Sequence, residues 1–254
     1  MLPRGSPTCD PRTFFNTRAR DHASDPIKAV CLDDPEANIC IDRIQHRVLT
    51  KAMRHVAERG SLADLRVLDY GCGPGRWVSF LRAEGCAYSG VDIADEMLAI
   101  ARRRHPGVEF GNMDSDRIPY ADNTFDLVWC IAVLHHNPYP AQEAIISEMA
   151  RVLRDDGSLV LFEGLGSDKE EHAGYHPRPL HEWLVLAGRQ RLSCRWQLGA
   201  NYWLLRALVG QSVNAALWRK RLTRIDAIID PYLLPLVPRR WHKRAAMVFR
   251  KQPA

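Results

Sequence analysis

Val67-Leu68-Asp69-Tyr70-Gly71-Cys72-Gly73-Pro74-Gly75 is the stretch of this 254-residue chain that decides its fold. Its first two residues end a short apolar run that is typical of a buried strand, and three glycines then alternate over five positions. Because glycine has no Cβ, such a turn can adopt left-handed backbone angles and let a ligand lie against the main chain. Apolar residues follow at helical spacing from Trp77 to Leu81. A strand, a glycine turn and a helix together present free helix N–H groups to a bound molecule.

Two kinds of cofactor suit a glycine turn of this type. A dinucleotide fingerprint requires G-x-G-x-x-G, with an acid about 20 residues further on that binds the ribose. Here Arg76 takes the sixth position and the third glycine comes one residue early. Asp92 ends the next apolar run and can bind ribose hydroxyls with either cofactor. Asp69 discriminates, because a fixed carboxylate beside the turn repels a pyrophosphate but suits a cationic ammonium and sulfonium. We therefore expect S-adenosylmethionine rather than NAD.

Further motifs follow in order: Gly90-Val91-Asp92-Ile93, then Asn112 to Tyr120, then Phe125 to Val128 running into Ile131–His136, then Glu148 to Gly157 leading into Ser158–Glu163. With the glycine turn, this series resembles the class I S-adenosylmethionine-dependent methyltransferases, specifically the methyltransferase 11-like group. The resemblance covers residues 66 to 163 and implies that Asp114 lies next to the adenine amino group. Asp156-Gly157 replaces the family's more usual glycine pair, and Asn112 stands where the family is often acidic.

The expected site residues follow from this resemblance and from their places at strand ends. For the cofactor they are Asp69, Gly71, Cys72, Gly73, Gly75, Asp92, Ile93, Met97, Asp114, Ser115 and Cys130. His135 and His136 are the candidate catalytic bases, because they follow the fourth strand and an imidazole of pKa about 6.5 suits that work. The alternative is that one of them caps a loop or packs the following helix. Glu163, His176 and His181 are candidate substrate contacts.

Strands and helices alternate along the chain, which predicts an α/β fold with right-handed crossovers and a mostly parallel sheet. We expect a Rossmann-like, seven-stranded sheet whose last strand is antiparallel, with helices on both faces. The expected strands span 66–70, 87–92, 108–111, 125–131, 158–163, 191–197 and 245–250. The expected helices span 41–60, 75–84, 95–104, 140–153 and 180–187. The predicted organisation is an extension or lid over 1–40, a methyltransferase domain over 41–198 and 244–254, and a helical insertion over 199–243.

The first 40 residues carry a weaker prediction. Residues 1 to about 25 are polar and broken by prolines, which indicates a mobile segment up to Phe14-Phe15. The resembled family often begins with an aromatic and arginine-bearing helix that folds over the cofactor. Phe15, Arg18 and Ala19 are placed where such a lid helix would lie.

Charge is distributed unevenly over the chain. The net charge is +5, but residues 189 to 254 hold 14 Lys and Arg against Asp226 and Asp230, so this quarter carries +12 and the rest −7. The split indicates contact with something anionic, such as a phosphate-bearing acceptor, a membrane surface or nucleic acid. A solvated basic surface without a ligand is the alternative.

The cysteines indicate the cellular compartment, and the histidines raise the question of a metal site. Seven scattered cysteines, none in a C-x-x-C pair, and a start without an apolar signal core indicate a cytoplasmic protein, with peripheral membrane contact as an option. Glu170, Glu171, His172, His176 and His181 resemble metal ligands, but Gly174, Pro177 and Pro179 interrupt any helix there. We expect a substrate-facing loop and no metal.

The leading hypothesis is methyl transfer to a small-molecule or glycan acceptor, by O-methylation of an anionic or lipid-linked substrate. A tRNA or other RNA methyltransferase is the second hypothesis, although no separate RNA-binding module is visible. A non-catalytic cofactor-binding regulator is the third, and the intact Asp69, Gly71, Gly73, Asp92 and Asp114 count against it.

Overall fold

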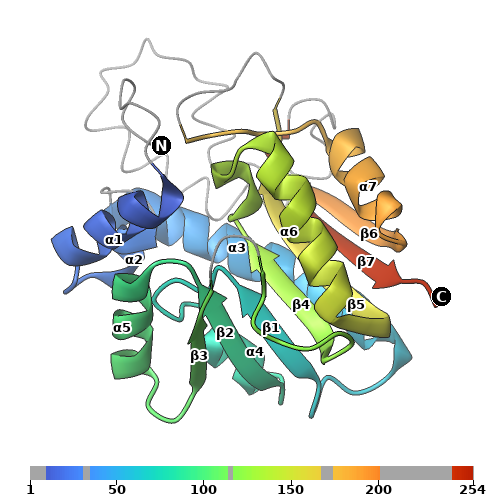
Figure 1. The fold of residues 1–254 in the computed structure, drawn as a ribbon, viewed down its shortest axis with the longest axis horizontal. Helices are drawn as coiled ribbons and strands as arrows, with labels where there is room; N and C mark the ends of the chain where they lie inside the picture. The colour runs from blue at the N-terminus through green and yellow to red at the C-terminus, as the bar shows by residue number, and fades with distance from the viewer. Residues whose placement is uncertain (1–9, 31–34, 114–116, 167–173, 201–241, 254) are drawn as a thin grey trace.

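The computed structural model describes residues 10–30, 35–113, 117–166, 174–200 and 242–253 (Figure 1). The strands are β1 (Arg66–Tyr70), β2 (Ala87–Asp92), β3 (Glu109–Asn112), β4 (Phe125–Ile131), β5 (Leu153–Gly164), β6 (Leu192–Ala200) and β7 (Arg244–Lys251). The α-helices are α1 (Pro11–Asp21), α2 (Pro26–Val30), α3 (Pro35–Val56), α4 (Val78–Ala83), α5 (Asp95–Arg104), α6 (Tyr139–Val152) and α7 (Leu180–Arg189). Two 3-10 turns, η1 (Ala57–Arg59) and η2 (Leu134–His136), complete the described elements.

The seven strands form one sheet in the order β3-β2-β1-β4-β5-β7-β6. The first five pair in parallel, and β7 runs antiparallel between β5 and β6. This arrangement confirms the predicted fold class. In register, Asp69 lies between Gly90 and Trp129, so the carboxyl ends of β1, β2 and β4 meet at one edge. That edge is where ligands bind in sheets of this kind.

Each face of the sheet is covered by its own helices. One cluster of buried side chains joins α3, α4 and α5 to β-strand residues such as Trp129 and Val160. A second cluster joins α6 and α7 to residues such as Val128 and Leu161 on the opposite face. Figure 1 shows α6 in front of the sheet and α3 behind it. The alternation of neighbouring residues between the two clusters is the period-two pattern of a strand buried on both faces.

Helix α1 begins at Pro11, inside the segment that was expected to be mobile up to Phe14-Phe15. Asp10 caps this helix by accepting a hydrogen bond from Thr13 N at 3.0 Å, and proline occupies the first turn, where no N–H is needed. Sequence periodicity missed the helix because Ala19 is its one fully buried residue. With Ala29 of α2, Ala19 packs on Met97 and Ile100 of α5. The lid position expected for Phe15, Arg18 and Ala19 therefore belongs to an ordered helix.

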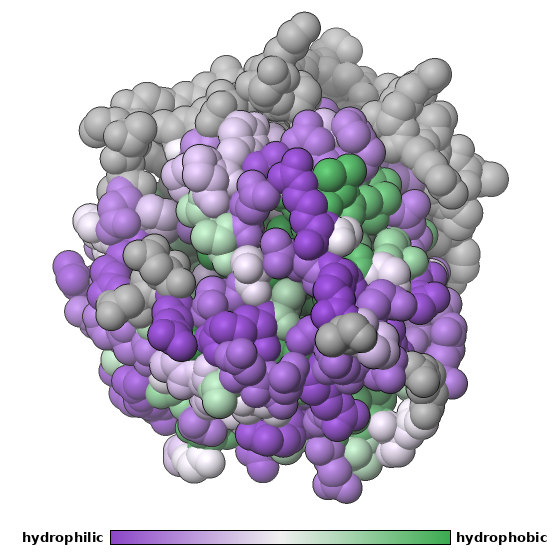
Figure 2. Space-filling view, turned by 45° about the vertical axis from the view of Figure 1, so that its right-hand side comes forward, coloured by the Kyte–Doolittle hydropathy of each residue, from purple (hydrophilic) through white to green (hydrophobic). Residues whose placement is uncertain are grey.

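Other boundaries differ by several residues. Helix α3 begins at Pro35, six residues before the predicted start, and β5 begins at Leu153 because its first residues pair with Phe125 across a bulge in the ladder. Most of the predicted insertion, residues 201–241, lies outside the described residues, so the domain division stays a prediction. No helix in the described ranges is long and apolar enough to cross a membrane. The face drawn in Figure 2 is mostly hydrophilic, with some hydrophobic areas. The exposed large apolar side chains of the described residues are Ile27, Ile39 and Val185.

Candidate functional site

The glycine turn after β1 is held in left-handed conformations. Gly71, Gly73 and Gly75 have φ values of 71°, 51° and 74°, which L residues with a Cβ rarely adopt. The N–H groups of Gly71 and Cys72 donate to Val91 O at 2.8 and 3.0 Å, which ties the turn to β2. A Cβ at Gly71 would lie 2.5 Å from Val133 Cγ2, whereas at Gly73 it would meet only Val30 Cγ1, at 3.1 Å. The turn is therefore closely packed at its start and roomier at Gly73.

Asp92, at the end of β2, holds two loops together. Its Oδ2 accepts a hydrogen bond from Gly73 N and its Oδ1 one from Ala94 N, both at 2.8 Å. The side chain is 8% exposed. Burial raises its pKa, while the backbone N–H groups work in the opposite direction. A carboxylate thus fastens the glycine turn to the start of α5, at the place predicted for ribose binding.

Asp69 is buried on β1 beside this turn. Tyr88 of β2 donates its hydroxyl proton to Asp69 Oδ2 at 2.7 Å. Burial raises the pKa of Asp69 to about 7, although the Tyr88 hydrogen bond works against the rise. The carboxyl group expected to attract a cationic ligand is therefore close to its titration point at neutral pH. Sequence reasoning missed Tyr88, which reads simply as a strand residue.

Glu163, near the end of β5, organises the segment that follows β4. Its Oε1 accepts hydrogen bonds from Val133 N at 3.1 Å and Leu134 N at 3.0 Å, and its Oε2 accepts one from His135 N at 3.2 Å. His135 Nδ1 also lies against Oε2. Glu163 was predicted to touch substrate, but its side chain has no exposed surface. The carboxylate instead holds a segment that starts at Ala132, a non-glycine residue with φ of 61°.

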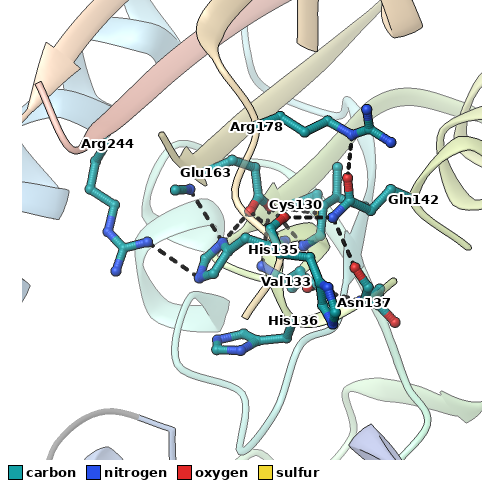
Figure 3. A network of polar contacts seen from close by, with 12 residues as sticks. Cys130, Val133, His135, His136, Asn137, Gln142, Glu163, Arg178 and Arg244 are labelled. Atoms are coloured by element: carbon teal, nitrogen blue, oxygen red, sulfur yellow. Dashed lines mark hydrogen bonds and ion pairs between the residues drawn. The ribbon is translucent and has the colours of Figure 1, made fainter. Parts of the chain in front are cut away.

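His135 lies between Glu163 and Arg244, the first residue of β7 (Figure 3). Its Nε2 is 3.3 Å from Arg244 Nη1. A guanidinium can only donate, so Nε2 accepts from Arg244. Nδ1 has two neighbours, the Glu163 carboxylate and the Gly164 N–H at 3.3 Å. Burial, followed by the Arg244 charge, holds the pKa of His135 well below its usual value. This predicted catalytic histidine is neutral and has a partner at each ring nitrogen.

His136 has a different environment. It is half-buried, and its Nδ1 lies 3.2 Å from Gly174 O, which makes Nδ1 the donor and leaves the lone pair on Nε2. Burial, followed by the neighbouring His135, lowers the pKa of His136 to about 3. Its ring meets Phe15 of α1 edge-on at a centroid distance of 5.6 Å. Figure 3 shows the ring directed away from the Glu163 carboxylate.

A second polar chain anchors the segment that passes beside these histidines. Gln142 Nε2 donates to Asn137 O and His176 O, both at 2.8 Å, and Arg178 Nε donates to Gln142 Oε1 at 2.6 Å (Figure 3). His176 N donates to His135 O at 2.7 Å, while its ring faces Tyr139. His181 is exposed in the first turn of α7. The backbone of His176 therefore links this segment to His135.

The other predicted residues fall into two groups. Cys72, Cys130 and Met97 are buried and Ile93 is partly buried, so the structure uses them in packing at the carboxyl edge. Asp114 and Ser115 lie outside the described residues. Sequence reasoning missed Arg244, Gln142 and Arg178. Pairing of Arg244 with Gly164 across β5 and β7 could have drawn attention to it only once the strand register was known. Within the described ranges, no group of three or more His, Cys, Asp or Glu could hold a metal ion.

The sequence of this chain is similar to those of known methyltransferases. Residues 67–157 match a family model described as a methyltransferase domain. The chain is 36% identical over 103 residues to malonyl-(acyl-carrier protein) O-methyltransferase of Enterobacter lignolyticus, covering 41% of this chain and 40% of that protein. It is 29% identical over 196 residues to phthiotriol/phenolphthiotriol dimycocerosates methyltransferase of Mycobacterium leprae, covering 75% and 65%.

A solved structure shares the fold over nearly the whole chain. Magnesium protoporphyrin IX methyltransferase of Synechocystis PCC 6803 with bound SAH superposes with a TM-score of 0.63 at 18% identity, covering 95% of this chain and 98% of that one. The sequence relatives match less completely. The chain spans between 37% and 65% of the length of the first curated relatives it matches.

Proposed function

We propose that this chain, whose residues 67–157 match a methyltransferase domain, is a class I S-adenosylmethionine-dependent methyltransferase that transfers a methyl group to a small-molecule or lipid acceptor. The observation that carries the proposal is the clamp of Asp92 on Gly73 and Ala94, which holds a left-handed glycine turn open at the carboxyl edge of the sheet. Such a turn lets a ligand approach the main chain closely.

The residues at this edge fit the cofactor. Asp69 and Asp92 end adjacent strands, and burial raises the pKa of both carboxyl groups, so a cationic ligand would relieve the cost of their negative charge. We assign Asp69 to the ammonium group, Asp92 to the ribose hydroxyls and the turn from Gly71 to Gly75 to the methionine portion. When bound, the cofactor would supply a methyl group on a sulfonium, which an acceptor atom could take in line as the carbon–sulfur bond breaks and the neutral thioether leaves.

His136 is the residue we assign to proton removal when the acceptor is a hydroxyl. Its Nδ1–H is fixed on Gly174 O, so its Nε2 carries the lone pair. The pKa of about 3 keeps this ring unprotonated but makes it a weak base, so proton removal by His136 requires that the bound acceptor raise this pKa. His135 is assigned to positioning, because its two nitrogens are occupied by Glu163 and Arg244. A general base contributes about 10²–10⁴-fold to a rate. An acceptor that is already a carboxylate needs no base.

An anionic or lipid-linked acceptor has two supports. The relatives include a protein named for O-methylation of a malonyl group on a carrier protein and one named for a dimycocerosate lipid. In this chain, the Arg244 guanidinium lies 3.3 Å from His135 and 5.9 Å from the centre of the Tyr175 ring, so a cation stands beside the proposed acceptor position. Guanidinium groups bind carboxylates and phosphates through paired hydrogen bonds.

Titration calorimetry with S-adenosylhomocysteine, with NADH as the control, tests the cofactor. Micromolar binding of the first alone supports the proposal, and binding of NADH alone contradicts it. Methyl transfer is then followed on a panel of free fatty acids, malonyl thioesters and hydroxylated lipids. The assignment of a methyl acceptor fails if the folded protein binds S-adenosylhomocysteine but methylates no member of the panel.

His136→Asn separates the base from the binding site. We expect turnover on a hydroxyl acceptor to fall by about 100-fold or more, with the affinity for S-adenosylhomocysteine unchanged. His55→Asn, on α3, is the matched control and should leave both quantities unchanged. Full activity of His136→Asn on a hydroxyl acceptor would show that another group removes the proton.

A further inference from the structure

The outer face of α3 carries a row of cations that the methyl-transfer site does not use. Arg43, Arg47, Lys51 and Arg54 are all exposed and are spaced by four, four and three residues. On an α-helix this spacing places side chains on one stripe. The stripe is about 16 Å long at 1.5 Å per residue. The opposite face of α3 packs Ile44, Val48 and similar residues on the sheet, which fixes the row toward solvent.

The acids that flank the row are engaged elsewhere. Asp42 accepts a hydrogen bond from Arg76 Nη2 at 2.7 Å, and Glu58 contacts His55 Nδ1 at 2.6 Å. The sequence between them contains no Asp or Glu. A run of four cations without interspersed acids creates a positive potential along this side of the molecule.

Exposed apolar side chains lie at the amino end of the row. Ile39, one turn before Arg43, is 48% exposed. Ile27, on the preceding helix α2, is 41% exposed. These are two of the three exposed large apolar side chains among the described residues. Helix α2 also carries Val30, which faces Gly73 of the glycine turn. The apolar end of the row therefore comes to the edge of the sheet that holds the site.

We propose that the outer face of α3 docks on a membrane surface that contains anionic lipids. Basic side chains are attracted to anionic headgroups, and apolar side chains beside them can enter the interface between headgroups and acyl chains. Nucleic acid fits less well, because single strands are usually bound by exposed aromatic side chains between the cations. On α3 the only ring between Arg43 and Arg54 is His46, which is packed against Trp77 and Phe80. The proposal does not depend on the identity of the methyl acceptor.

Vesicle co-sedimentation of the full chain tests this surface. The probes are vesicles of phosphatidylcholine alone and of phosphatidylcholine mixed equally with phosphatidylglycerol, at low and at raised ionic strength. The row variant is Arg43→Gln, Arg47→Gln, Lys51→Gln and Arg54→Gln together. The matched control replaces four exposed arginines elsewhere: Arg82→Gln, Arg103→Gln, Arg191→Gln and Arg195→Gln. Circular dichroism checks that both variants remain folded.

We expect the wild-type chain to bind the phosphatidylglycerol vesicles and to release them as salt rises. The row variant should bind on the order of 100-fold more weakly, because each cation near an anionic surface contributes to binding. The control should stay within threefold of wild type, a limit set by the loss of net charge alone. Ile39→Ser should weaken binding without changing its dependence on salt.

Three results would overturn the proposal: no binding of wild type to either vesicle, equal losses in the row variant and the control, or binding that does not require phosphatidylglycerol. A parallel titration with a fluorescent RNA distinguishes the other anionic partner. If the row variant loses affinity for RNA but keeps its affinity for vesicles, the row is a nucleic-acid surface. Because no assay here uses turnover, failure of the proposed function would leave these results unaffected.

Discussion

At the scale of the residue, Asp69 shows how burial adjusts one carboxyl group for ligand binding. Its pKa of about 7 means that at neutral pH a substantial fraction of the molecules carry a proton there. A cationic ligand beside it stabilises the charged form and lowers that pKa. Binding of the proposed cofactor is therefore coupled to the loss of a proton from Asp69.

We expect the affinity for S-adenosylhomocysteine, whose amino group stays charged over this range, to rise about tenfold between pH 6 and pH 8. Calorimetry in buffers of different ionisation enthalpy should detect release of up to one proton at the acid end of this range. Asp69→Asn should bind more weakly and without this pH dependence. A wild-type affinity that does not change across this range would show that Asp69 is already ionised or does not meet the ligand.

Glu163 and His135 illustrate the difference between a residue type and its role. From the sequence, a Glu near the end of the fifth strand was predicted to be a substrate contact, and a His after the fourth strand was predicted to be a base. In the fold, Glu163 accepts three backbone N–H groups and faces the Nδ1 of His135. Burial raises its pKa while these donors work in the opposite direction. Such a buried carboxylate holds a segment in place, and its loss leaves several buried donors without acceptors.

At the scale of the element, the turn between β1 and α4 depends on glycine at packed positions, of which Gly71 is the tightest. Gly71 has φ of 71°, and a Cβ there would lie 2.5 Å from Val133 Cγ2. Val133 belongs to the segment that Glu163 holds, so its backbone cannot shift away without breaking that hydrogen bond. Strain in the turn is therefore transmitted to the histidines.

Gly71→Ala should reduce the free energy of unfolding by about 2–4 kcal/mol, from the left-handed backbone and the overpacking together. It should also weaken binding of S-adenosylhomocysteine. Gly188→Ala is the control, since no atom lies within 4 Å of its added Cβ in α7, and alanine there should stabilise by about 0.5–1 kcal/mol. Urea unfolding followed by circular dichroism measures both. Equal stability of Gly71→Ala and wild type would contradict the packing described here.

Helix α1 packs against both His136 and the buried residues around Met97. It carries Phe15 onto His136 and Ala19 onto the group that contains Met97. Arg18 donates to Ala29 O at 3.1 Å, which ties α1 to α2. The amino-terminal helices therefore form one wall of the proposed site rather than a separate appendage.

At the scale of the whole molecule, the two neighbouring histidines couple stability to pH. The folded protein holds the pKa of both below 6.5, so under acid conditions the unfolded chain binds protons at these positions that the folded chain does not. Stability from this source is present above pH 6.5 and is lost as the pH falls below it. Asp69, whose pKa is raised, acts in the opposite sense.

Comparison of wild type with His136→Asn isolates one of these contributions, because Asp69 is common to both. Between pH 7 and pH 5.5, wild type should lose up to about 1 kcal/mol more of its free energy of unfolding than the variant does. Urea titrations at the two pH values give the difference. If the two proteins lose stability in parallel, His136 is protonated in the folded state as readily as in the unfolded chain.

The sequence by itself determined the sheet, the glycine turn and the placing of Asp69 and Asp92. Strand periodicity, the positions of glycine and the order of motifs are local properties, so β1, β2 and β4 were predicted to the residue. Hydrophobic periodicity did not indicate helix α1, which was expected only from the family resemblance, because its arginine-rich sequence buries little surface of its own and packs on α5. The position of α1 therefore depends on α5 as much as on the sequence of α1 itself.

Only the tertiary structure decided what the polar groups do. Glu163, His135 and Arg244 come from three separate parts of the chain, and their contact depends on β7 entering the sheet beside β5. The same holds for Tyr88 with Asp69 and for Asp92 with Gly73. A hydrogen-bond partner and a shifted pKa are set by burial and by neighbours that are distant in sequence. The sequence therefore placed the chemical groups at one edge of the sheet, and the packing assigned each of them its partner.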